Sequence, residues 1–150
     1  NKERIKLMIK KFAIAVAMLS SSAFAANDIV MHRDPGCGCC EKWAAQVRSA
    51  FGRKVQVIDD RQRSSLQRKI GLPADLVSCH TALIDGMAFE GHVPIADMKR
   101  VLATKPKGVK GLAVAGMPLG SPGMEAPGRP RDRYHVFAFG TARPTIFKSY

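Results

Sequence analysis

Three cysteines, Cys37, Cys39 and Cys40, fall within four positions in the stretch DPGCGCCEKW. The fourth cysteine of the chain, Cys79, lies well downstream in SCHTAL. Clustered thiols serve three chemistries in proteins: structural disulfides, thiol–disulfide exchange and the binding of soft metal ions. Which of them applies depends on the compartment of the protein and on the elements that position the sulfurs.

Structural disulfides alone are the weakest interpretation. Adjacent Cys39 and Cys40 do not easily bridge each other, because a disulfide needs a Cα separation of about 4.4–6.8 Å and a defined geometry. Local pairing within CGCC would also close a very short loop and therefore add little stability.

A thiol–disulfide oxidoreductase is the second interpretation. Cys37 would be the nucleophile and Cys40 the resolving thiol of a C-x-x-C pair at a helix start, where the helix dipole lowers thiol pKa values. The additional Cys39 argues against this interpretation, because a third thiol offers a competing mixed disulfide.

Metal binding is the third interpretation. Converging thiolates suit soft ions, Cu(I) first, whereas zinc usually takes two pairs of closely spaced ligands and iron–sulfur clusters need other spacings. Met117 and Met124 are soft candidate ligands in the Gly/Pro-rich stretch AVAGMPLGSPGMEAPG, with core packing as the alternative for both. His80, beside Cys79, is the best candidate ligand among the four histidines.

The N-terminal stretch MIKKFAIAVAMLSSSAFAA has the pattern of a secretory signal peptide. Lysines follow Met8, an apolar run extends over 12–19, and Ala23-Phe24-Ala25 supplies the small-x-small cleavage pattern. The apolar run is too short to span a bilayer, which takes about 20 residues.

Export and cleavage follow from this pattern as expectations. We expect a periplasmic protein that keeps no stable membrane anchor after cleavage near Ala25-Ala26. The expected division of the chain is residues 1–25 as the signal peptide, with residues 1–7 upstream of a true start at Met8, and residues 26–150 as a single metal-binding domain.

The chain is basic, with 24 Lys and Arg against 12 Asp and Glu and a net charge of +12 over 150 residues. Without residues 1–25 the net charge is still +8. The basic residues are scattered and lack the aromatic-interleaved stripe of proteins that bind single-stranded nucleic acid. We therefore expect no nucleic acid partner and interpret the charge as a solvated surface that attracts acidic partners or anionic lipid.

Short strand and helix patterns alternate along the remaining chain. The clearest is the hairpin TALIDGMAFE, because Asp85-Gly86 between two apolar runs suits a type I′ turn. The segment from Pro106 to Pro130 is dense in Gly and Pro and predicts little regular structure. The predicted strands are 28–33, 54–60, the two arms of the hairpin within 81–90, and a terminal pair at 134–140 and 144–150; the predicted helices are 40–51, 65–70 and 94–102.

The predicted order is β-α-β-α-β-β-α, with the dithiol at the start of the first helix. That order, with a C-x-x-C next to a strand–helix unit, is typical of thioredoxin-like domains. The predicted fold class is therefore α/β and thioredoxin-like, with an added Gly/Pro/Met-rich loop and a C-terminal β-hairpin.

Three stretches, PGCGCCEKW, SCHTALIDGMAFEGHVP and GLAVAGMPLGSPGME, resemble the CopG-type periplasmic copper-resistance proteins, predicted metal-binding proteins long classed as a domain of unknown function. The resemblance spans about 29–150, and three motifs in the right order make it specific. All four cysteines match the family motif, and Met117 and Met124 match its GMPxGSPGM stretch. Ala115 departs from it, since the family often has proline there, which changes loop stiffness and leaves every sulfur in place.

The resemblance implies an exported thioredoxin-like domain that handles copper. Its role would be sequestration of Cu(I) or cycling between Cu(I) and Cu(II), the latter making it a copper oxidoreductase; the alternative is a thiol–disulfide oxidoreductase that uses Cys37 and Cys40. Expected partners are copper ions and other periplasmic copper-handling or redox proteins. The expected ligands of Cu(I), with several ions sharing thiolates, are Cys37, Cys39, Cys40, Cys79, Met117 and Met124.

Overall fold

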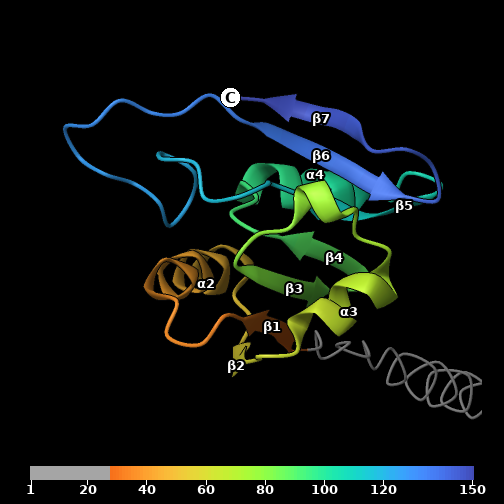
Figure 1. The fold of residues 1–150 in the computed structure, drawn as a ribbon, viewed down its shortest axis with the longest axis horizontal. Coiled ribbons are helices and arrows are strands. Elements are labelled where there is room, and N and C mark those ends of the chain that lie inside the picture. The colour runs from red at the N-terminus through yellow and green to blue at the C-terminus, as the bar shows by residue number, and fades with distance from the viewer. Residues whose placement is uncertain (1–27) are drawn as a thin grey trace, which may run out of the picture.

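The computed structural model describes residues 28–150, so the predicted signal peptide in residues 1–25 lies outside the described residues. The described residues have a mixed α/β fold, in which three α-helices pack on a seven-stranded sheet (Figure 1). None of these helices is long and apolar enough to cross a membrane. The strands are β1 (Ile29–Arg33), β2 (Val55–Asp59), β3 (His80–Ile84), β4 (Met87–Glu90), β5 (Val109–Ala113), β6 (His135–Gly140) and β7 (Thr145–Ser149), and the helices are α2 (Gly38–Phe51), α3 (Arg63–Ile70), the 3-10 helix η1 (Ala74–Leu76) and α4 (Ile95–Thr104).

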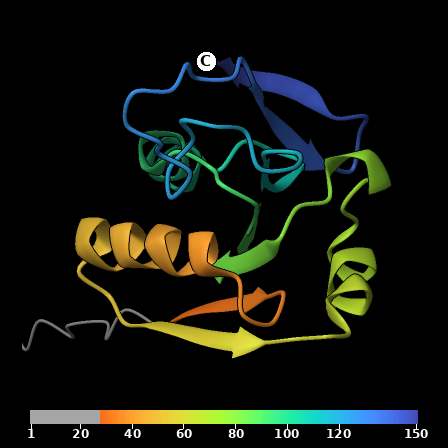
Figure 2. The same ribbon diagram turned by 60° about the vertical axis from the view of Figure 1, so that its left-hand side comes forward.

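The strands lie in the order β2-β1-β3-β4-β5-β6-β7. β1 is parallel to β2 and β4 is parallel to β5, while all other neighbouring pairs are antiparallel. Helices α2 and α4 lie on one face of the sheet and α3 lies on the opposite face (Figure 2). The predicted strands and helices are thus present, and the sheet has one strand more than the sequence predicts.

Each face of the sheet has its own core. Trp43 and Val47 of α2 and Met98 and Val101 of α4 are fully buried in the larger cluster. Burial of a side chain of this size stabilises the fold by about 1.5–3 kcal/mol, so this core fixes α2, and with it the cysteine-bearing N-terminus of the helix, on the sheet. The smaller cluster consists of Leu76, Ala88, Ala113 and Phe139.

The β3–β4 hairpin turns at Asp85-Gly86, as the sequence predicts. The φ angles of these residues are 49° and 83°, and a type I′ turn requires positive φ at both positions. The turn sets the register, in which Thr81 pairs with Glu90. Residues just before β3 therefore face residues just after β4.

The prediction of little regular structure from Pro106 to Pro130 was wrong at β5 (Val109–Ala113). A Cβ at Gly111 would lie 1.9 Å from the backbone oxygen of Ala88, so only glycine permits the close approach of β4. Glycine also weakens a strand pattern in the sequence, which hides β5. Residues 114–134 contain no helix or strand, in agreement with the prediction, and we call residues 114–124 the methionine loop.

The C-terminal hairpin of β6 and β7 is confirmed and is fixed to α4. The Tyr150 hydroxyl donates a hydrogen bond of 2.8 Å to Asp97, which is buried. The guanidinium of Arg100 lies 4.2 Å from the centre of the Phe147 ring. The hairpin thereby extends the sheet beyond β5 without contributing a cysteine.

Candidate metal centre

The N-terminus of α2 positions three of the four sulfurs. The chain leaves β1 through a turn at Gly36, whose φ is +74°, and Cys37 is the extended N-cap residue of the helix. Cys39 and Cys40 lie in the first turn, where Cys40 points into the core and is fully buried. No side chain caps this helix end, so its free N–H groups and positive dipole end lie beside the cysteines and favour thiolates.

The start of β3 brings Cys79 to the same place. β1 and β3 are antiparallel neighbours with Arg33 opposite His80, so the residue after β1 meets the residue before β3. The Asp34 N–H accordingly donates to the Cys79 carbonyl oxygen at 3.0 Å. The topology therefore places Cys79 at the N-terminus of α2, 39 residues from Cys40 in the sequence.

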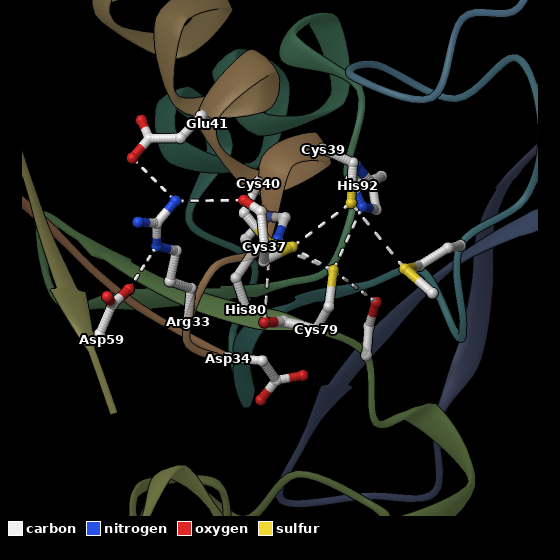
Figure 3. Close-up of a disulfide and its surroundings, with 12 residues drawn as sticks. Arg33, Asp34, Cys37, Cys39, Cys40, Glu41, Asp59, Cys79, His80 and His92 are labelled. Atoms are coloured by element: carbon white, nitrogen blue, oxygen red, sulfur yellow. Dashed lines mark hydrogen bonds and ion pairs between the residues drawn. A yellow bond between two sulfur atoms is a disulfide. The ribbon is translucent and has the colours of Figure 1, made fainter. Parts of the chain in front are cut away.

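The four cysteine sulfurs converge on one site (Figure 3). All four Sγ atoms lie within 4.8 Å of one another. Cys37 and Cys40 form a disulfide, whereas Cys39 and Cys79 are free. Each sulfur of the disulfide faces a free thiol, because Cys39 Sγ lies 3.4 Å from Cys37 Sγ and Cys79 Sγ lies 3.4 Å from Cys40 Sγ.

The two candidate methionines differ in position. Met117 lies next to the cluster, with its Sδ atom 3.9 Å from Cys39 Sγ. Met124 is half-buried further along the methionine loop, where its N–H donates to Ser121 O at 2.8 Å and its carbonyl accepts from Gly120 N at 3.0 Å. The structure thus brings Met117 to the cysteines, and a ligand role for Met124 stays a prediction.

His92 joins the site although the sequence analysis does not single it out. It is fully buried, and its Nε2 atom lies 3.3 Å from Cys79 Sγ. Its Nδ1 atom lies 2.8 Å from the carbonyl oxygen of Pro122, which can only accept, so Nδ1 carries the proton. The lone pair of Nε2 therefore faces Cys79, which is the arrangement of a metal-ligating histidine with its other N–H held by a carbonyl.

His80 also contacts the Cys79 sulfur, from a fully buried position. Its Nδ1 atom is 3.5 Å from Cys79 Sγ, and Cys79, His80 and His92 form a second group of ligand atoms within 4.8 Å of one another. The His80 ring lies 4.5 Å from the Trp43 ring and is fully buried, and its Nε2 atom has no hydrogen-bond partner. Burial holds the pKa of His80 well below its ordinary value of 6.5 and also lowers that of His92, so both rings are neutral near neutral pH.

Burial acts on Cys79 in the opposite sense. Burial, and after it the charge of Cys39, raises the pKa of the Cys79 thiol to about 12. Without a cation, Cys79 is therefore a protonated thiol at neutral pH. A soft cation at the site would replace that proton, since the thiolate is the form that binds metal.

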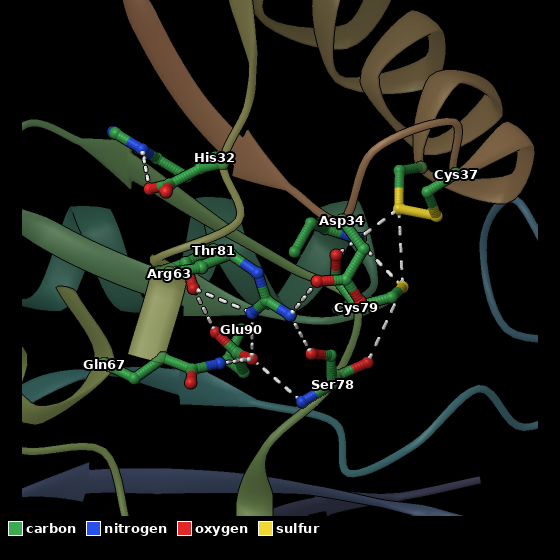
Figure 4. A network of polar contacts seen from close by, with 12 residues as sticks. His32, Asp34, Cys37, Arg63, Gln67, Ser78, Cys79, Thr81 and Glu90 are labelled. Atoms are coloured by element: carbon green, nitrogen blue, oxygen red, sulfur yellow. Dashed lines mark hydrogen bonds and ion pairs between the residues drawn. A yellow bond between two sulfur atoms is a disulfide. The ribbon is translucent and has the colours of Figure 1, made fainter. Parts of the chain in front are cut away.

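A buried ion pair lies behind Cys79 and fixes the residue before it (Figure 4). Glu90 has no exposed surface and accepts from Arg63 at 3.0 Å, from Gln67 at 2.8 Å and from the Ser78 N–H at 2.8 Å. Thr81 donates to its second carboxylate oxygen. Burial raises the pKa of Glu90, and these hydrogen bonds oppose the rise.

Arg63 connects this ion pair to both cysteine-bearing segments. Its Nη2 atom donates to the Ser78 carbonyl oxygen at 2.6 Å and to Asp34 at 2.9 Å. Ser78 precedes Cys79, and Asp34 lies in the turn that leads to Cys37. The Arg63–Glu90 network, formed by Arg63, Glu90, Gln67, Ser78, Thr81 and Asp34, therefore holds the two segments in register.

The methionine loop covers the site and is held at several points. The Ser78 hydroxyl donates to the Gly116 carbonyl, and His92 donates to Pro122 as described. At Gly123 a Cβ would lie 2.8 Å from the Cys39 oxygen, so glycine allows the loop to lie directly on the first turn of α2. The loop thus closes over the buried cysteines.

Comparisons with known proteins agree with this picture. The family model of a protein of unknown function, DUF411, matches residues 76–124, which include Cys79, His92 and the methionine loop. Two solved structures of the copper resistance protein CopG, its Form 1 and Form 2, are 37% and 38% identical to the chain, with TM-scores of 0.75 and 0.74. They cover 83% and 82% of this chain, which in turn covers 98% and 97% of theirs. The chain belongs to the CopG family of copper resistance proteins. No curated protein matches it.

The sequence of this CopG-family protein contains a signal for His92 that the sequence analysis does not use. A two-residue turn at Asp85-Gly86 pairs residues symmetrically about it, and the observed pairs from Ile84–Met87 to Thr81–Glu90 follow that symmetry. Two positions further, the same symmetry sets Cys79 opposite His92. No comparable signal exists for Arg63 and Glu90, which meet only through the packing of α3.

The donor set of the CopG-family site fits a soft cation. Thiolates, a thioether and neutral imidazoles suit Cu(I), with imidazole also suiting harder divalent ions. The Cys37–Cys40 disulfide must be reduced before all four cysteines offer thiolates. The same sulfurs can therefore carry two electrons or bind a soft ion, but Cys37 and Cys40 cannot do both at once.

Proposed function

We propose that this protein binds Cu(I) as its cargo through the thiolates of Cys37, Cys39, Cys40 and Cys79, for copper resistance by sequestration or by Cu(I)/Cu(II) redox chemistry. One observation carries the proposal, namely that all four Sγ atoms lie within 4.8 Å of one another at the N-terminus of α2. Thiolates that close can share ions, so more than one Cu(I) fits the same four sulfurs. Met117, Met124 and His80, together with His92, are the further candidate ligands.

The Cys37–Cys40 pair can also reduce copper. Reduced Cys37 and Cys40 can deliver two electrons to two Cu(II) ions, which yields two Cu(I) ions, the Cys37–Cys40 disulfide and two protons. The product Cu(I) then binds to Cys39 and Cys79, which remain free when the disulfide is present. Renewed reduction by an external dithiol would restore the four-thiolate site.

We further propose a thioredoxin-like fold for the half of the sheet that carries the cysteines. The order β2-β1-β3-β4, with β1 parallel to β2 and β3 antiparallel to both of its neighbours, supports it. So does the position of the dithiol, at the start of the helix that follows β1. The strands β5, β6 and β7 and the methionine loop would then be the additions.

A periplasmic location completes the proposal. The signal-peptide pattern in residues 1–25 supports export, and a disulfide persists more readily in an oxidising compartment than in the cytosol. Other copper-handling or redox proteins of that compartment are the proposed partners. N-terminal sequencing of the protein purified from periplasmic extract would test this, with a mature start near Ala26 as the expected result.

The decisive experiment measures the ratio of copper to protein. The purified protein is reduced, loaded anaerobically with Cu(I), and dialysed against a competing Cu(I) chelator. A retained ratio above one is expected from shared thiolates. Complete loss of copper while four thiols react freely with a thiol reagent would refute the proposal.

A thiol–disulfide oxidoreductase is the second candidate function, and the Cys37–Cys40 disulfide is the observation that favours it. Cys37 is partly exposed and Cys40 is fully buried, as expected of an attacking and a resolving thiol. Replacing Cys39 with Ser separates the two functions. The change should weaken Cu(I) retention if the four thiolates act together, whereas a Cys37–Cys40 exchange cycle should survive it.

A further inference from the structure

Five sulfurs of the site form a line that leads from the surface into the core, in the order Met117, Cys39, Cys37, Cys40 and Cys79. Met117 is 52% exposed, Cys39 and Cys37 are partly exposed, Cys79 is 7% exposed and Cys40 is fully buried. Neighbouring sulfurs along this line are close, at 3.9 Å between Met117 and Cys39, 3.4 Å between Cys39 and Cys37, and 3.4 Å between Cys40 and Cys79, with the disulfide joining Cys37 to Cys40. The line therefore connects the surface to the buried end of the cluster.

Met117 occupies an unusual position for a methionine, because no core surrounds it. It is one of the few large apolar side chains that the described residues leave exposed. Hydrogen bonds hold the loop on both sides of it, from Ser78 to the Gly116 carbonyl and from the Leu119 N–H to Asp132 at 2.8 Å. The backbone is thus fixed so that the thioether lies at the surface and beside Cys39.

The exposed end of this line offers Cu(I) a different ligand from the cysteines. A thioether is a neutral, polarisable and soft ligand, whereas a thiolate binds Cu(I) as an anion. Cu(I) that arrives at Met117 can therefore pass on to Cys39 without a large energy barrier, and it gains a stronger ligand there. A buried pair such as Cys40 and Cys79 offers no direct contact with an incoming carrier.

We infer that Met117 is the point at which Cu(I) enters and leaves the cysteine cluster by ligand exchange with a carrier that holds Cu(I) through labile soft ligands, an inference that rests on the proposed copper function. A bond from copper to the Met117 sulfur forms as a bond to the carrier breaks. A bond to Cys39 then replaces the bond to Met117, and the Cys39 proton leaves to solvent. Copper stays Cu(I) throughout, and no electron is transferred.

The experiment compares rates with equilibria. Reduced protein is mixed anaerobically in a stopped-flow instrument with a coloured Cu(I)–bicinchoninate complex, and the bleaching of that complex reports copper uptake. Release to excess bicinchoninate and the equilibrium copper retention are measured on the same samples. Met117→Leu removes the sulfur at similar volume. Val77→Leu is the matched control, because Val77 is 41% exposed and its carbonyl accepts from the Gly116 N–H, yet it carries no sulfur.

Met117→Leu should slow uptake and release by the same factor, about tenfold, which corresponds to about 1.4 kcal/mol in each barrier. Equal slowing leaves the equilibrium retention unchanged, and Val77→Leu should match the unaltered protein throughout. Unchanged rates in Met117→Leu would overturn the inference. So would faster release with weaker retention, because Met117 would then be a resident ligand and not an entry point.

The same measurements distinguish failure of the proposed copper function from failure of the inferred entry point. If the unaltered protein itself takes no copper from bicinchoninate and retains none, both the copper function and the entry point are refuted. If the unaltered protein retains copper and Met117→Leu exchanges it at the normal rate, only the entry point is refuted.

Discussion

Two groups of side chains meet at Ser78-Cys79, and they differ in what their contacts can do. On one side, five hydrogen bonds of the Arg63–Glu90 network join charged and polar groups at 2.6 to 3.0 Å. On the other side, free thiols face the disulfide sulfurs at 3.4 Å, where sulfur contacts are weak. The hydrogen-bonding groups of the first group are mostly paired, with Arg63 Nε as the buried exception, whereas the sulfurs of the second group can still bind a cation or carry an electron pair.

This difference separates stability from chemistry within one short segment. The backbone of Ser78 is fixed by the Arg63–Glu90 network through both its N–H and its carbonyl. This holds Cys79 close to Cys40, although the Cys79 sulfur itself makes only weak contacts. Substitutions in the network should therefore change the stability of the fold, and substitutions among the sulfurs should change what the protein binds.

The largest effect is expected from Arg63→Met. It leaves the carboxylate of Glu90, which has no exposed surface, without its cation. Removing one partner of a buried ion pair lowers the free energy of unfolding by about 3–5 kcal/mol. Guanidinium denaturation of the unaltered and variant proteins measures the loss.

Arg33→Met is the matched control for that change. Arg33 also makes two ion pairs, with Asp59 and Glu41 at 2.7 Å each, but the side chains of both partners are about half exposed. Loss of exposed ion pairs costs about 1 kcal/mol or less. Equal losses in the two variants would contradict the division between a structural network and a sulfur site.

The next effect in size is expected from Cys79→Ser in the reduced protein. The change removes the thiolate at the buried end of the cluster, and Cu(I) retention against a competing chelator should fall by about 100-fold. The free energy of unfolding should change by about 1 kcal/mol, which is typical of a small buried substitution. His135→Gln, at an exposed histidine that bonds Ser149, should retain copper normally. Normal retention in Cys79→Ser would exclude Cys79 as a ligand.

The part of the site that could be predicted is the part that local pattern determines. The cysteines of CGCC lie at a helix start because the helix signal begins there, and Asp85-Gly86 fixes the hairpin that carries Cys79. The same hairpin register would have identified His92 as well. Local chemistry and turn geometry therefore identify most ligand candidates, whereas the pairing of β1 with β3 brings Cys79 to the other cysteines.

The Arg63–Glu90 network could not be predicted, because its members look like ordinary surface residues in the sequence. Arg63 belongs to the stretch RQRSSLQRKI, whose charges indicate a solvated helix face. Only the position of α3 against the sheet turns Arg63 inward and buries it to 6% exposure. β5 escapes prediction for a related reason, since the need for glycine at Gly111 arises from β4 and not from its neighbours in the chain.

A smaller effect is expected from Gly123→Ala, which tests the cover over the sulfur side. Gly123 has a φ of +84°, and a Cβ would lie 2.8 Å from the backbone oxygen of Cys39 and 2.9 Å from the backbone nitrogen of Trp43. Gly128→Ala is the matched control, because Gly128 has a similar φ of +78° and nothing within 4 Å of its Cβ position. Both variants carry the strain of positive φ, about 1–2 kcal/mol.

Only Gly123→Ala adds overpacking, so its unfolding free energy should fall by about 1 kcal/mol more than that of Gly128→Ala. Thermal and chemical denaturation of both variants measure the difference. The same clash should lift the loop from α2 and increase the rate at which a thiol reagent modifies Cys39. Identical behaviour of the two variants would show that the loop does not rest on the helix.

The smallest effect is expected from Asp60→Asn, which removes a partly exposed pair between Asp60 and His32. The Asp60 carboxylate accepts from the Gln62 N–H at 2.8 Å and pairs with His32 at 2.9 Å, and these contacts lower its pKa below the ordinary value of 3.8. A lowered pKa in the folded state stabilises the fold above pH 3.8, and the contribution is lost as the pH falls through the folded-state pKa. The variant should therefore unfold slightly more easily than the unaltered protein near neutral pH, and the two should converge in acid. Denaturation midpoints measured across this pH range test the sign, and a difference that persists or grows in acid would show that the charge of Asp60 does not stabilise the fold.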